Sequence, residues 1–144
     1  MNTKLLRRVA KHISEEPKRL AMGLWIQRKD DSYSGDGLVY EHYHQDGQFS
    51  NRATKHRFAQ CGTAGCIAGW AVLLKHGVTK AGKICDVPVE AAKILDIEDC
   101  GRLFYVDDWP EEFSLPYLSA HTPAKRARIA VARIEHFIKT KGAE

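Results

Sequence analysis

The sequence lacks any apolar run long enough to cross a membrane, which needs about 20 predominantly apolar residues. Its longest uncharged stretch, residues 59–74, is interrupted by three glycines and a threonine. Charged side chains begin at Lys4, without the apolar segment of a secretory signal peptide. These absences predict a cytoplasmic protein, in which the four cysteines are expected to be reduced thiols.

Several motifs that carry enzyme chemistry are also missing. There is no P-loop, no dinucleotide-binding glycine pattern and no G-x-S-x-G, so nucleotide hydrolysis and serine hydrolase chemistry have no support. There is no C-x-x-C or H-E-x-x-H pair for a metal ion, no internal repeat and no low-complexity tract. The sequence therefore predicts no cofactor, and its 144 residues suit one domain.

The uncharged stretch stands out in a chain in which 28% of the residues are charged. Because such a segment has no polar face to offer to water, it predicts a buried central helix at about 62–76. Thr63 is a candidate N-cap for this helix. Gly77 is a candidate for the left-handed residue that ends it.

The other apolar patterns predict a mainly α-helical, compact single domain, residues 1–144, around this central helix. Apolar residues recur at three- and four-residue spacing from Thr3 to Glu16. A shorter helix is expected to begin near Pro88, and Thr122-Pro123 predicts the start of a helix that continues to the end. Residues 113–118 are interpreted as an irregular apolar strap.

A polar, insertion-like region at 27–57 interrupts the helical pattern. Within it, 38–50 is a possible short β-hairpin with a turn at Asp46-Gly47. Its candidate binding residues are Tyr40, His42, Tyr43 and His44. The two histidines alternate on one face of a strand, which makes them weak metal candidates, although the simpler interpretation is two exposed histidines and no metal.

An acidic corner at Asp107, Asp108 and Trp109 is the second candidate binding surface. Adjacent carboxylates on a turn do not share a pocket by default, so they are interpreted as caps or as partners of basic side chains rather than as a catalytic pair. We expect this corner and the hairpin to contact a partner protein.

Two cysteines lie at the entrance of the predicted central helix. Cys61 precedes its N-terminus and Cys66 lies in its first turn, where the helix dipole and unpaired N–H groups favour a thiolate. A thiol-dependent enzyme using Cys61 or Cys66, with His56 or His121 as the base, is therefore one alternative function. The competing interpretation is that both cysteines are small buried packing residues.

The net charge of +4 is unevenly distributed. Basic residues dominate 1–29 and 122–144, whereas 86–112 is strongly acidic. The simplest interpretation is that the basic terminal helices pair with the acidic middle or are solvated, and nucleic-acid binding through them is a second alternative function. A helix-turn-helix is not expected, because the second helix of any such pair would be apolar.

The sequence also contains five short motifs: C-G-T-x-x-C-I-A-G-W-A at 61–71, L-F-Y at 103–105, W-P at 109–110, T-P at 122–123 and R-I-x-x-F-I at 133–138. In these patterns the chain resembles a group of small uncharacterised proteins of bacteria and their phages. The resemblance implies an origin in bacteria or their phages and a compact helical domain with an accessory function, and it gives no residue a role. The sequence as a whole favours a small binding or regulatory protein that acts through contact with a partner protein.

Overall fold

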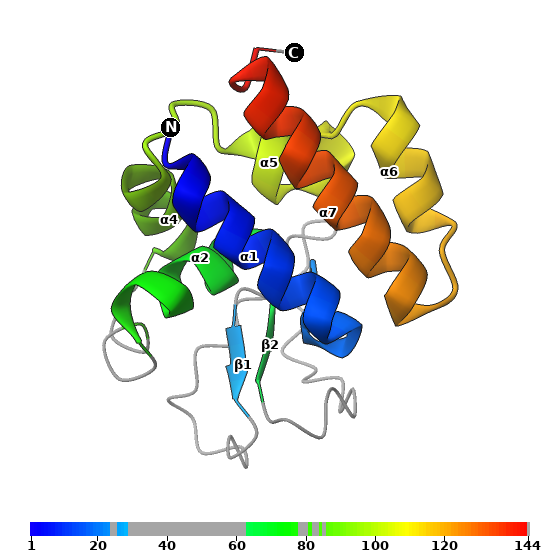
Figure 1. Cartoon of the computed structure of the whole chain (residues 1–144), viewed down its shortest axis with the longest axis horizontal. Helices are drawn as coiled ribbons and strands as arrows, with labels where there is room; N and C mark the ends of the chain where they lie inside the picture. Colours follow the sequence, from blue (N-terminus) through cyan, green and yellow to red (C-terminus); the bar gives the residue numbers. More distant parts are fainter. Residues whose placement is uncertain (24–25, 29–62, 78–80, 82–83, 85, 144) are drawn as a thin grey trace, which may run out of the picture.

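Helices make up most of the described chain, as the sequence predicted. The computed structural model describes residues 1–23, 26–28, 63–77, 81, 84 and 86–143 (Figure 1). Its elements, in chain order, are α1 Thr3–Glu15, η1 Pro17–Arg19, β1 Ile26–Arg28, β2 Thr63–Gly65, α2 Ile67–His76, α4 Val87–Leu95, α5 Gly101–Phe104, η2 Val106–Asp108, α6 Glu111–Leu118 and α7 Pro123–Thr140. The hairpin predicted at 38–50 lies outside the described residues.

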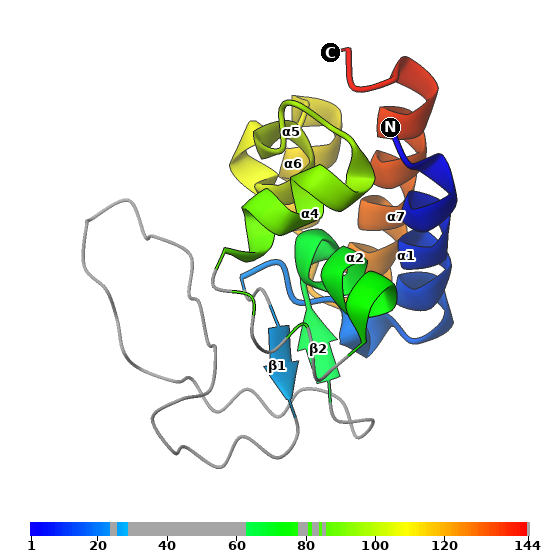
Figure 2. The same ribbon diagram turned by 90° about the vertical axis from the view of Figure 1, so that its left-hand side faces the viewer.

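The first and last helices, α1 and α7, lie side by side and run antiparallel in one layer (Figures 1 and 2). Each helix has one buried side, formed by Leu5, Leu6, Val9, Ala10 and Ile13 on α1 and by Ala127, Ala130, Arg133, Ile134 and Phe137 on α7. These residues recur at three- and four-residue spacing, so the opposite side of each helix is left to solvent.

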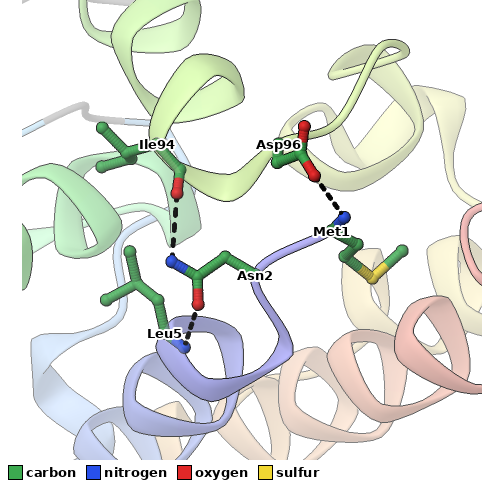
Figure 3. Close-up of polar contacts among 5 residues, drawn as sticks. All are labelled: Met1, Asn2, Leu5, Ile94 and Asp96. Atoms are coloured by element: carbon green, nitrogen blue, oxygen red, sulfur yellow. Dashed lines mark hydrogen bonds and ion pairs between the residues drawn. The ribbon is translucent and has the colours of Figure 1, made fainter.

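Polar contacts attach the start of α1 to the end of α4 (Figure 3). The Oδ1 atom of Asn2 caps α1 by accepting a bond from the N–H of Leu5 at 3.1 Å, and its Nδ2 donates to the carbonyl of Ile94 at 3.2 Å. The α-ammonium of Met1 lies 2.7 Å from Oδ2 of Asp96, and this hydrogen bond lowers the pKa of the carboxyl group. These bonds hold the N-terminus of α1 at the C-terminal end of α4.

The remaining helices lie behind the α1–α7 layer, and α2 lies between α4 and α1 (Figure 2). Every residue from Ile67 to Leu73 is buried, and α2 packs against α1 and α4. The ring Nε1 of Trp70 donates to the carbonyl of Arg19 at 2.9 Å, which ties α2 to η1. The prediction of a buried central helix is therefore confirmed.

The predicted start of this helix, at about 62 with Thr63 as N-cap, is wrong. Thr63–Gly65 forms β2, which pairs antiparallel with β1 and places Gly65 opposite Ile26. The helix begins at Ile67, with Cys66 as its N-cap. Local periodicity could not predict that residues 63–65 form a strand, because the partner strand β1 is distant in sequence. The pairing satisfies backbone N–H and C=O groups that a helix would otherwise pair. Gly77 ends the helix with a positive φ of 77°, as expected, but with a ψ of 165° that is not left-handed helical.

The interpretation of 113–118 as an irregular strap is also wrong, because these residues belong to α6. The helix begins after Pro110 and contains Pro116, whose missing N–H removes one bond from its interior. The backbone N–H of Ser119 still donates to the carbonyl of Leu115 at 3.0 Å. Proline and two exposed leucines gave this segment an apolar pattern without a clear helical period.

Candidate functional site

Cys66 is a structural residue in the core. Its side chain is fully buried, and its Sγ accepts a hydrogen bond from the N–H of Gly69 at 3.4 Å, which caps α2. Burial raises the pKa of this thiol to about 12. The helix N-terminus favours a thiolate, but here the cost of burying a charge is the larger effect. A protonated, enclosed thiol cannot serve as a nucleophile at neutral pH.

We expect Cys66 to remain unmodified when the folded protein is treated with iodoacetamide at pH 7–8. With a pKa of about 12, roughly one thiol in ten thousand is ionised at pH 8. Mass spectrometry of each cysteine before and after unfolding in urea measures this, with half-buried Cys100 in the same chain as the internal reference. Rapid alkylation of Cys66 in the folded state would contradict the structural role.

The thiol-enzyme hypothesis also needs a base beside the thiol. His121 is exposed in the connection between α6 and α7, whereas Cys66 is enclosed, so these two residues do not form a catalytic pair. Burial raises the pKa of Cys100 as well. Cys61 and His56 lie outside the described residues, and a role for Cys61 stays a prediction.

The acidic corner is split between surface and core. Asp107 and Asp108, in η2, are exposed as the binding hypothesis requires. Trp109 is only 4% exposed, and its Nε1 donates to the carbonyl of Leu103 at 3.0 Å. Its ring also meets the edge of Tyr117, with the ring centroids 5.3 Å apart. Trp109 is therefore a core residue, and its assignment to a binding surface is wrong for this structure.

Next to this corner, α6 presents an apolar strip that sequence reasoning missed. Leu115 and Leu118 are 55% and 59% exposed, and with Glu111 they share one side of the helix at i, i+4 and i+7. The side chains of Asp107, Asp108, Glu111 and Glu112 are all exposed near the start of α6. We call these six residues the α6 face. The strip could have been found only by assigning 111–118 to a helix.

Aromatic and cationic contacts hold α6 against the rest of the molecule. Tyr117 is buried against Trp109, and the guanidinium of Arg126 lies 5.9 Å from its ring centroid. Burial raises the pKa of Tyr117 to about 12, so its phenol stays protonated. Phe113 packs edge-on against His136 of α7, with ring centroids 5.2 Å apart. The α6 face is thus carried by a helix whose other side is fixed.

The hairpin candidates Tyr40, His42, Tyr43 and His44 lie outside the described residues, so neither binding nor metal coordination by them is tested. Within the part of the chain that the structure describes, no group of three or more His, Cys, Asp or Glu side chains could hold a metal ion.

Comparisons with protein-family models, with curated proteins and with solved structures find no match to this chain. Of the helices in the described part of the chain, none is both long and apolar enough to cross a membrane. The candidate surfaces therefore rest on the residues of this chain alone.

Proposed function

We propose that the protein is a binding or regulatory protein that contacts a partner protein through the α6 face. The partner contributes a short segment in which apolar side chains alternate with lysine or arginine. The observation that carries this proposal is the joint exposure of Leu115 and Leu118 on one side of α6. A predicted origin in bacteria or their phages agrees with such an accessory role and stays a prediction.

Two features of the α6 face support this choice of partner. Neighbouring exposed apolar side chains, rimmed by polar residues, are typical of interaction sites and supply the buried centre of an interface. Four exposed carboxylates lie at one end of the strip, so a basic segment is attracted to it and an acidic one is repelled. The carboxylates contribute mainly to the rate of association and to specificity, and the leucines to affinity.

The rigidity of α6 adds to this argument. Its buried side is fixed by the Trp109–Tyr117 contact and by the packing of Phe113 against His136. A surface that is already ordered loses little conformational entropy when a partner binds. The thiol-enzyme alternative has no comparable support in the described residues, because Cys66 is enclosed and protonated.

A displayed peptide library, selected against the full chain, tests the proposal. We expect the enriched peptides to combine large apolar residues with lysine or arginine. They should bind the double variant Leu115→Ser/Leu118→Ser about tenfold or more weakly than the wild type. Val89→Ser is the matched control, since Val89 is 62% exposed on α4 and lies outside the α6 face.

Two results would overturn the proposal. Peptides that bind the leucine double variant as tightly as the wild type would show that the α6 face is not the binding surface. Enriched peptides without basic residues would contradict the stated partner chemistry. Since both leucines are exposed, the serine variants are expected to keep their fold, which circular dichroism verifies.

A further inference from the structure

The outward side of the α1–α7 layer is strongly basic. Both helices lie at one side of the molecule, with the other helices behind them (Figure 2). Apart from Arg126, whose guanidinium lies over the ring of Tyr117, their exposed cations are Lys4, Arg7, Arg8 and Lys11 on α1 and Lys125, Arg128 and Lys139 on α7. These seven residues are called the basic face. The exposed acidic residues of the same two helices are Glu15 and Glu135.

The acidic middle of the chain does not neutralise the basic face. Its carboxylates belong to α4, η2 and the start of α6 and to the segments that flank and join them. The ion pairs that the structure describes between these segments and the terminal helices join Met1 to Asp96 and His136 to Glu112. Neither pair includes a residue of the basic face. The interpretation that the basic helices pair with the acidic middle therefore does not hold for the basic face.

The contacts that these cations make leave most of their charge available. Lys11 lies 3.7 Å from Glu15, but both side chains are exposed, and such pairs contribute little. Arg8 donates from Nη2 to the carbonyl of Leu74 at 3.4 Å, which leaves its charge uncompensated. Arg7 is exposed about 100° around α1 from Arg8, and Arg128 lies on the exposed side of α7.

The composition of the basic face indicates what it binds. The large hydrophobic side chains that are exposed in the described chain are Val89, Leu115 and Leu118, and none belongs to α1 or α7. A protein interface needs apolar or aromatic anchors at its centre, and a helix on a membrane surface needs an apolar side to insert. The one phenyl, phenol or indole ring on these helices, Phe137, is buried, so no such ring is offered for stacking single-stranded bases.

We propose that the basic face binds the phosphodiester backbone of a nucleic-acid duplex without reading its sequence. At a rise of 1.5 Å per residue, the 13 residues of α1 and 18 residues of α7 extend about 20 and 27 Å. A DNA duplex carries one negative charge about every 1.7 Å along its axis, so several phosphates lie within reach of such a surface. Two helices side by side do not enter a groove, so their contacts are with phosphates, which carry no sequence information.

Fluorescence anisotropy with labelled 20-base-pair DNA and RNA duplexes of unrelated sequences tests this proposal, using the full chain between about 50 and 200 mM salt. We expect binding that is independent of sequence, with log K falling linearly against log salt. Arg7→Gln and Arg128→Gln should each weaken binding about fivefold to tenfold at 0.1 M salt and reduce the slope by about one. The duplex that binds more tightly shows whether the basic face prefers the backbone of DNA or that of RNA.

Lys93→Gln is the matched control, because Lys93 is exposed on α4 and its replacement changes the net charge by the same amount. We expect it to leave duplex affinity unchanged. A loss for Lys93→Gln equal to that for Arg7→Gln would mean that net charge alone attracts the duplex, and would overturn the proposal. So would the absence of salt-dependent binding to either duplex, or equally tight binding to phosphatidylserine vesicles at matched salt. The α6 variant Leu115→Ser/Leu118→Ser should bind the duplex normally, which separates this test from that of the α6 face.

Discussion

Replacing Trp109 by alanine is expected to lower the free energy of unfolding by about 3–5 kcal/mol. The indole is 4% exposed, donates to the carbonyl of Leu103 and contacts the ring of Tyr117. Alanine removes all of these contacts and leaves a cavity between α5 and α6. Urea denaturation, monitored by circular dichroism at 222 nm, measures the loss against a total stability of about 5–15 kcal/mol for a domain of this kind.

Two control variants distinguish a core role from a binding role for this residue. Trp109→Phe keeps most of the apolar volume and loses the hydrogen bond, so its effect should be clearly smaller than that of alanine. Asp107→Asn changes an exposed neighbour and should alter stability by no more than about 0.5 kcal/mol. If Trp109→Ala were as stable as the wild type, the indole would not be part of the core, and the acidic corner would again be a complete candidate surface.

The sequence correctly predicted the start of α7, a proline in the first turn of α4 and the burial of α2. Thr122 caps α7 through its Oγ1, which accepts from the N–H of Lys125 at 3.2 Å, and Pro123 occupies the first turn. Pro88 similarly lies in the first turn of α4, and an uncharged segment became the buried α2. Each of these features depends on residues within one or two helical turns, so the pattern along the chain contains the needed information.

The sequence did not predict features that depend on contacts between distant segments. β2 forms because it pairs with β1, which is far away in sequence, and this pairing moves the start of α2 to Ile67. The same change turns Cys66 from a candidate nucleophile into a buried cap, because its environment is set by the packing of other elements. Packing between elements also decides which candidate binding residues are buried and which are exposed. A pattern of residue types could not show that Trp109 points inward while Leu115 and Leu118 point outward.

Arg133 of α7 supplies the second large effect, because its basic side chain lies in the core. It is fully buried, with its guanidinium between the rings of Phe113 and Phe137, at 5.7 and 5.4 Å from their centroids. Its Nη2 donates to the carbonyl of Arg102. These contacts join α5, α6 and α7 at one point. The buried cation is stable there because ring faces and a carbonyl oxygen replace part of its lost hydration.

Arg133→Ala is therefore expected to lower the free energy of unfolding by about 3 kcal/mol, since it removes two cation–π contacts and leaves the part-buried carbonyl of Arg102 without this donor. Arg133→Lys keeps the charge but not the planar group that fits between two rings, so we expect an intermediate loss. Arg128→Ala is the matched control, because it makes the same substitution at an exposed position of α7 and should change stability by about 0.5 kcal/mol or less. Equal stability of Arg133→Ala and Arg128→Ala in urea denaturation would show that the buried guanidinium does not hold the three helices together. A large loss for Arg133→Ala alone would show that buried Arg133 holds α5, α6 and α7 together, whereas exposed Arg128 does not.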